Sequence, residues 1–186
     1  MATKDAKIVL GSGKLYCMEF VGDIPAPETL EAEENLLGLI QGGATLEYTP
    51  ESYTAEDDLG LAKKTIITKE VALLKSGVMV WNGVTLTKLC ATARITEDTE
   101  TGIRAVKIGG VGNQDGKKYT IHFRHEDKTD GDIRVTIVGK NTAGFSLAFA
   151  KDKETVIDAE FAAEPQDDEG TLILLREDIP SAGAGI

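Results

Sequence analysis

The sequence predicts a mainly-β fold built on an antiparallel sheet. Between Lys117 and Glu177, apolar and polar residues alternate in a series of short runs. Successive side chains of a strand point to opposite faces, so this alternation is typical of strands with one buried and one wetter face. Short segments rich in turn-forming residues separate the runs, and such connections favour antiparallel hairpins over parallel crossovers.

The apolar positions of these runs predict five strands. Run by run, they are Tyr119, Ile121 and Phe123; Ile133, Val135 and Ile137; Phe145, Leu147 and Phe149; Ile157, Ala159 and Phe161; and Leu172 and Leu174. Turn-forming connections lie at residues 127–131, 141–144 and 165–170. Asp, Asn, Gly and Pro favour turns in these connections because they tolerate or impose the backbone angles that turns need.

The N-terminal half is predicted to add three more strands. Lys14–Val21 is predicted as the first strand, and Ala44–Tyr48 and Lys63–Leu74 as the two strands of a hairpin. Glu28–Gln41 is ambiguous. Its leucines fit a helical stripe, whereas Gly38 costs a helix about 1 kcal/mol relative to Ala.

The segment between the two hairpin strands is predicted to be a long exposed loop. Thr49–Ala62, with the sequence TPESYTAEDDLGLA, is acidic, prone to turns and poor in residues that would be buried. Connections of this length without regular structure are uncommon in compact domains, and they are usually functional or disordered. We therefore expect this loop to protrude from the fold.

One segment, Asn82–Arg94, has the periodicity of an amphipathic helix. Asn82 is expected to cap its first turn by accepting a backbone N–H. The apolar positions at i, i+3, i+4 and i+7 are Leu86, Leu89, Cys90 and Ala93. After this helix, only a weak strand is predicted, at Ile103–Ile108.

Length and composition bound the organisation and the partners. The 186 residues fit a single domain, 1–186, with a flexible N-terminal arm at 1–13 and a tail of small residues at 180–186. The formal net charge is −11. This argues against binding to nucleic acid or to anionic membranes, because affinity for phosphates comes from Lys and Arg. No stretch approaches the roughly 20 apolar residues of a membrane helix, and the two cysteines make no disulfide framework, so folding in a reducing cytoplasm is expected.

No constellation of residues indicates catalysis, a cofactor or a metal. Cys17 and Cys90 are expected to be two small buried hydrophobes, since neither belongs to a paired metal motif. His122 and His125 are the only histidines; three residues apart on a strand, they point to opposite faces. His122 shares its face with polar residues and is expected at a solvated or interface position. The carboxylates are scattered, and no serine stands in a nucleophile elbow, so an enzyme is not predicted.

Two stretches resemble the tail tube proteins, or major tail proteins, of phages with Gram-positive hosts. The first stretch comprises residues 42–60, GGATLEYTPESYTAEDDLG, and residues 63–83, KKTIITKEVALLKSGVMVWNG. The second comprises residues 131–178, in which a strand ending in an acid-aromatic pair leads through a proline and an Asp-Asp-Glu-Gly turn into the last strand. The order and spacing of these stretches carry the resemblance, which extends over about residues 42–179.

The resemblance implies an antiparallel β-sandwich or partly closed barrel with one flanking α-helix and a long protruding hairpin loop. It also implies hexameric rings whose inner strands join into a β-lined pore and which stack into a tube. A long loop would reach from one ring to the next. The residues expected to serve as this inter-ring loop are Thr49, Pro50, Glu51, Tyr53, Glu56, Asp57, Asp58 and Leu59.

A tube of this kind implies a conduit for DNA and a location in the virion tail, after assembly in the host bacterial cytoplasm. An acidic lumen would repel DNA phosphates, so that the genome slides without specific binding. Asp158 and Glu160, on the polar face of their strand, are the hypothesised pore-facing residues. Sheath, tape-measure, tail terminator and baseplate proteins are the further partners implied, and no membrane is.

Two alternatives remain open on the sequence. One is a tube subunit of a phage-like bacteriocin or contractile injection system, which differs in cargo and would be marked by a nearby sheath protein. The other is a monomeric β-barrel that binds a small molecule. An internal cavity lined by apolar side chains and a monomer mass independent of concentration would favour it.

Overall fold

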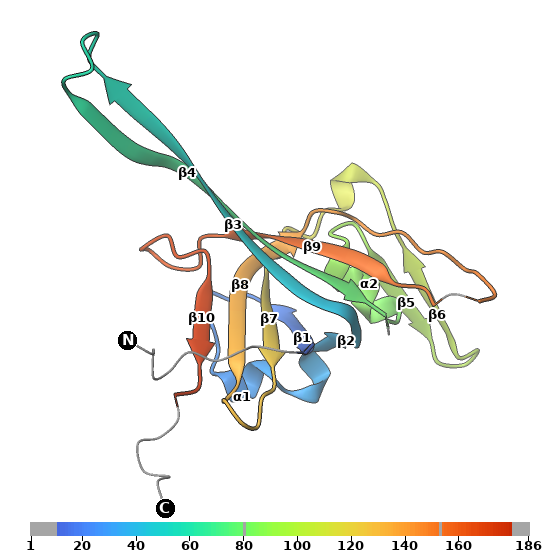
Figure 1. Ribbon diagram of the computed structural model, residues 1–186. Coiled ribbons are helices and arrows are strands. Elements are labelled where there is room, and N and C mark those ends of the chain that lie inside the picture. Colours follow the sequence, from blue (N-terminus) through green and yellow to red (C-terminus); the bar gives the residue numbers. More distant parts are fainter. Residues whose placement is uncertain (1–10, 80, 153, 180–186) are drawn as a thin grey trace, which may run out of the picture.

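The computed structural model describes residues 11–79, 81–152 and 154–179, and within them the fold is mainly β (Figure 1). An antiparallel sheet runs in the order β2-β1-β7-β8-β9-β4-β3, with β10 also paired to β8, and β5 and β6 form a separate two-stranded sheet. The strands are β1 (Lys14–Glu19), β2 (Leu36–Gly38), β3 (Ile40–Glu56), β4 (Lys63–Val78), β5 (Arg94–Asp98), β6 (Ile103–Lys107), β7 (Tyr119–His125), β8 (Ile133–Asn141), β9 (Ile157–Glu164) and β10 (Leu174–Glu177). The predicted fold class is confirmed.

Two helices accompany the sheets, whereas the sequence predicted one. Helix α1 (Pro27–Leu30) is a single turn within the segment that was ambiguous, and α2 (Gly83–Leu89) is the predicted helix. Asn82 caps α2 as expected, since its side chain accepts bonds from the backbone N–H groups of Val84 and Thr85. The prediction that α2 extends to Arg94 is wrong, because Arg94 begins β5 and pairs with Lys107.

The main sheet divides at β8. The first half of β8, Ile133–Thr136, pairs with β10, and Val138–Asn141 pairs with β9. Gly139 lies where β8 and β9 meet, and a Cβ atom at this position would stand 1.9 Å from the carbonyl oxygen of Ala162. Only glycine allows the two backbones to approach so closely.

The hydrophobic core lies between one face of the sheet and α2. The alternating residues meet there as predicted, because Ile121 of β7, Ile137 of β8 and Phe161 of β9 are all buried. Cys17 is also buried in this core, as expected, whereas the expectation that Cys90 is buried is wrong, because Cys90 at the end of α2 is only partly buried. Burial raises the pKa of the Cys17 thiol to about 12, which leaves it protonated and unreactive at neutral pH.

One predicted strand is not formed. Residues 145–149 are not part of a β-ladder, although Phe145 and Leu147 still pack against the core. The final strand begins at Leu174, so Leu172 precedes it.

Of the predicted N-terminal arm, residues 1–10 lie outside the described residues, as does the tail at 180–186. Ser12 is described, and its carbonyl accepts a bond from His125 Nδ1 at 2.8 Å.

The predicted long loop is mostly strand. Thr49–Glu56 belongs to β3 and pairs in register with β4, so only residues 57–62 form the turn. The expectation that this segment is exposed is correct, and Figure 1 shows the hairpin of β3 and β4 projecting far beyond the body. The conformation was predicted wrongly because turn-prone residues such as Pro50 sit on an edge strand, where a missing N–H leaves the β4 ladder intact.

Candidate assembly surfaces

The projecting part of the β3–β4 hairpin, residues 47–70, is called the arm, and all of its residues are exposed. Cross-strand side-chain pairs hold its two strands together: Lys69 Nζ lies 2.9 Å from a Glu51 carboxylate oxygen, and the hydroxyls of Thr54 and Thr65 are 2.9 Å apart. Exposed ion pairs contribute little, and an isolated two-stranded hairpin is marginally stable in water. The arm therefore has the character of a surface that a partner covers.

The tip of the arm is a closed turn. The Asp57 carboxylate accepts bonds from the backbone N–H of Ala62 at 2.6 Å and of Leu59 at 3.3 Å, and these bonds lower the pKa of Asp57. Gly60 has a φ of +68°, a conformation that favours glycine. This turn displays Leu59 and Leu61, which are 79% and 83% exposed. Asp57 thus shapes the tip, while the two leucines form its exposed apolar surface.

Further apolar side chains lie along the shaft of the arm. Tyr53 stands directly opposite Ile66 in the β3–β4 register, so the two share one face of the hairpin. They are 61% and 50% exposed. Solitary exposed apolar residues are common, but several on a segment with no core of its own indicate a binding surface.

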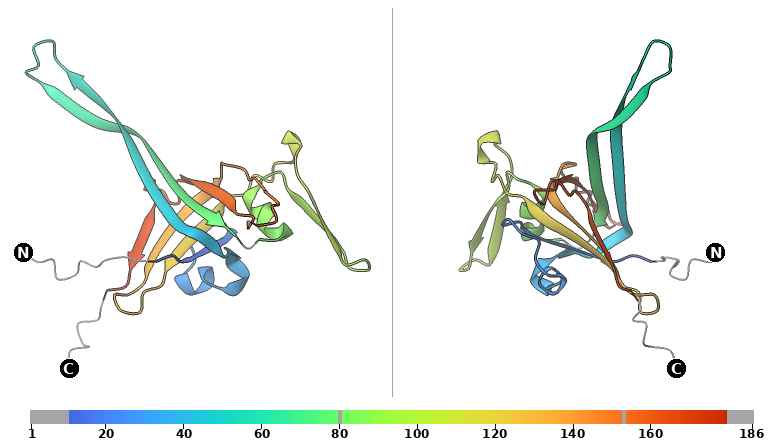
Figure 2. Two further views of the ribbon diagram at one scale, coloured as in Figure 1. Left: turned by 45° about the vertical axis from the view of Figure 1, so that its right-hand side comes forward. Right: turned by 90° about the vertical axis from the view of Figure 1, so that its left-hand side faces the viewer.

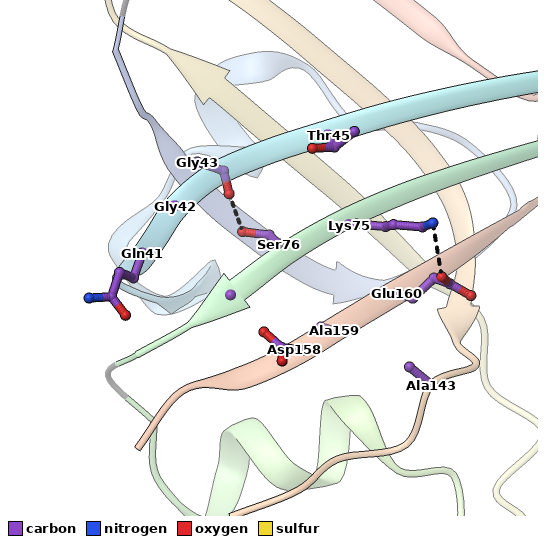
Figure 3. A pocket seen from close by; sticks show the side chains of 11 residues that line it. Gln41, Gly42, Gly43, Thr45, Lys75, Ser76, Ala143, Asp158, Ala159 and Glu160 are labelled. Atoms are coloured by element: carbon purple, nitrogen blue, oxygen red, sulfur yellow. Dashed lines mark hydrogen bonds and ion pairs between the residues drawn. The ribbon is translucent and has the colours of Figure 1, made fainter. Parts of the chain in front are cut away.

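Asp158 and Glu160 lie together on one face of β9, above an open hollow at the base of the arm (Figure 3). Lys75 of β4 stands beside them, with its Nζ 3.3 Å from Glu160 and 2.9 Å from Glu47. These two partners, Glu47 first, raise the pKa of Lys75. The sequence did not identify Lys75, because its place opposite Glu160 follows from the strand register.

The face around this hollow is of mixed charge. Glu164 of β9 pairs with Lys118 at 2.6 Å and with Lys140 at 3.7 Å, and these contacts, Lys118 first, lower the pKa of Glu164. By contrast, the side chain of Asp158 makes no hydrogen bond or ion pair with another described residue, while its backbone belongs to the β4–β9 ladder opposite Gly77. The structure thus brings the two predicted acidic residues together, and lysines partner the neighbouring carboxylates.

The other half of this sheet face is covered by α1 and the residues after it. Glu31, which follows α1, contacts the guanidinium groups of Arg124 and Arg134, each at 2.7 Å. It also lies 3.3 Å from His122 Nε2, while His122 Nδ1 is 2.8 Å from the Thr136 hydroxyl. The sequence-based expectation that His122 lies at a solvated or interface position does not hold in the single chain, where its side chain is fully buried.

Burial lowers the pKa of His122, so its imidazole is neutral at pH 7, and nearby Glu31 opposes the shift only in part. The covered polar face is therefore a structural network that fastens α1 to the sheet. Among the described residues, no three His, Cys, Asp or Glu side chains are grouped so that they could hold a metal ion.

Comparison with known proteins leaves the family open. The chain matches no protein-family model, and a search of curated proteins finds no match. Across the part of the chain that the structure describes, no helix is both long and apolar enough to cross a membrane.

Proposed function

We propose that this protein is a structural subunit of a phage tail tube that self-assembles into stacked hexameric rings and forms a conduit for DNA. The observation that carries the proposal is the arm, a fully exposed hairpin with apolar residues on its shaft and tip. A segment of this kind is costly in a lone molecule and becomes stable when a neighbour covers it. The resemblance of residues 42–83 and 131–178 to tail tube proteins supports the same conclusion.

The sheet also offers a long free edge. β3, with 17 residues, is the last strand of the main sheet and pairs only with β4. Unpaired N–H and C=O groups along such an edge promote association with another chain. Repeated head-to-tail contacts close into rings or extend into filaments, depending on the rotation between copies. Pairing between copies would satisfy this edge and build a continuous sheet around a pore.

The open face of β9 and β4 is the proposed pore lining, with Asp158 and Glu160 facing the DNA. Because Lys75 is engaged by Glu47 and Glu160, it is not free to bind a phosphate. Asp158 adds a carboxylate with no cationic partner among the described residues. DNA phosphates would pass such a lining without sticking. In a virion tail, tape-measure, terminator, baseplate and sheath proteins are the proposed partners.

The test is self-assembly of the purified protein as its concentration rises. We expect sedimentation to show a shift from monomer to large particles, and negative-stain microscopy to show rings and tubes. A variant in which a two-residue Asn-Gly turn replaces residues 50–70, so that it joins the paired residues Thr49 and Val71, is expected to keep a folded body and to remain monomeric, because the arm packs on nothing in the isolated chain. Wild-type protein that stays monomeric at every concentration would contradict the proposal.

A further inference from the structure

Residues 145–149, which connect β8 to β9, have the side-chain pattern of a strand but none of its backbone pairing. Phe145 and Leu147 pack against the core, whereas Ser146 and Ala148 are exposed. No backbone–backbone hydrogen bond joins any of these five residues to another described residue. Among the described residues, the one hydrogen bond to the segment comes from the Thr155 hydroxyl, which donates to the carbonyl oxygen of Ala148 at 2.6 Å. We call residues 145–149 the unpaired segment.

The unpaired segment ends in a large exposed side chain. Phe149 is 81% exposed, although the alternation of the sequence would place it on the buried side. A strand-like segment fixed to the core by two side chains, with free backbone groups and an exposed phenylalanine, has the features of a site for strand addition. Its sequence led to the prediction of a strand, and what is missing in the single chain is the neighbouring strand.

The chain contains one long edge that would suit this segment. Among the described strands at the edges of the sheets, β3 has 17 residues, while β2, β5, β6 and β10 have three to five each. Residues 63–72 of β4 are also open on the side away from β3, because β9 pairs only with Leu73–Val78. The open edge of β3 is therefore the longest of these edges, and it exceeds the unpaired segment in length. The two cannot meet within one chain, because the arm and the unpaired segment extend to opposite sides of the body (Figures 1 and 2).

The charges of the two elements are complementary. β3 contains three glutamates and no lysine or arginine: Glu47, Glu51 and Glu56. The unpaired segment is flanked by Lys140 and Lys151, both exposed. Each glutamate of β3 is already paired with a lysine of β4, so this complementarity orients the approach more than it strengthens the contact.

We propose that the unpaired segment of one copy joins the open edge of β3 in a second copy as an added strand. This contact explains two features at once, the strand pattern without a ladder at 145–149 and the bare edge of β3. Phe149 would then lie against the exposed aromatic and aliphatic side chains of the neighbour's arm. The inference rests on the proposed self-assembly and specifies which two elements meet in it.

Amide hydrogen exchange in free and assembled protein tests the contact. In the monomer, the amides of residues 145–149 are expected to exchange quickly, since they are bonded to no described backbone group. In tubes, we expect protection of alternate amides in this segment together with amides of β3 that are open in the monomer. Tubes that form while residues 145–149 still exchange quickly would overturn this inference alone. Wild-type protein that forms no assembly would overturn both proposals.

Proline substitution tests the same contact in the backbone itself. Ala148→Pro and Phe149→Pro remove the N–H from neighbouring positions, so one of them deletes a ladder donor whichever alternate set faces the partner. We expect that variant to raise the concentration needed for tube formation about tenfold, with an unchanged monomer melting temperature. The matched controls, Ala148→Val and Phe149→Val, keep the N–H and should still assemble. If both proline variants assemble like wild type, the proposed pairing is wrong.

Discussion

At the residue scale, the polar network beneath α1 shows how a buried polar face is kept stable. Glu31 balances two guanidinium groups and accepts from the imidazole of His122, which is wholly buried. Asp132 adds contacts to Arg124 at 2.6 Å and to Arg134 at 3.1 Å. Buried charges are tolerated when each is paired in this way, whereas removal of one partner is costly.

The buried His122 makes a prediction for stability against pH. Its pKa is lowered in the folded protein, so between pH 6.5 and the folded-state pKa the unfolded chain binds more protons. The stability that His122 contributes is present above pH 6.5 and is lost as pH falls toward its folded pKa. We expect the wild-type melting temperature to fall between pH 7.5 and pH 5.5, and that of His122→Gln to fall less. Equal slopes for the two proteins would contradict this account.

At the element scale, the sequence predicted the elements that depend on neighbouring residues. It failed for those that depend on partners far away in the sequence. Strands β7, β8 and β9 were predicted because apolar and polar residues alternate within each of them. The Asn82 cap was predicted because a cap depends only on residues next to it in the sequence. The extension of α2 to Arg94 failed because pairing of Arg94–Asp98 with Ile103–Lys107 overrides a helical periodicity. The arm was taken for a loop because its strand character comes from cross-strand partners such as Lys69 and Thr65.

The residues of the candidate surfaces show the same difference between local and distant determinants. Asp158 and Glu160 were placed correctly on one face, since they are two residues apart on a strand. Lys75 was missed because its proximity to Glu160 depends on the register between β4 and β9. His122 was expected at a solvated or interface position because no residue near it in sequence reveals that Glu31 contacts its ring.

The tip of the arm carries the second prediction, at the scale of an element. Replacing Leu59 and Leu61 together with serine removes the exposed apolar surface and leaves the Asp57 turn bonds, which use backbone N–H groups. Burying one leucine contributes about 1.5–3 kcal/mol, so the concentration for tube formation should rise at least about tenfold. The monomer melting temperature should not change.

The matched control is Leu175→Ser, which changes a leucine that is 55% exposed on β10, away from the arm. Sedimentation of both variants across a concentration series measures the effect. Assembly of the tip variant at the wild-type concentration would show that the leucines do not contact another copy.

At the scale of the whole molecule, one half of the main sheet is covered on both faces and the other half has one open face. The half formed by β1, β7 and the start of β8 is closed on one face by the core and α2, and on the other by the polar network beneath α1. The half formed by β9, β4 and β3 leaves one face open and extends into the arm (Figure 2). A rigid body that presents an open face and a long edge is the arrangement expected of a subunit completed by its neighbours.

The last prediction concerns the charge of that open face. Reversing Asp158 and Glu160 to lysine changes the charge of each subunit by four units, and a ring multiplies the change by its number of copies. Tubes should still form, because both side chains lie on the open face and outside the arm. Lysines lining a pore would bind phosphates, so DNA ejection from particles built with the variant should slow, and the slowing should weaken as salt rises.

The control is Glu100→Lys combined with Glu97→Lys, which reverses two exposed carboxylates on the β5–β6 hairpin and leaves the open face unchanged. Isolated tubes provide a second measurement, because tubes of the Asp158 and Glu160 variant should retain short DNA duplexes at low salt and tubes of the control should retain less. Normal ejection kinetics in the Asp158 and Glu160 variant would place these residues outside the pore, while leaving tube formation by the arm intact.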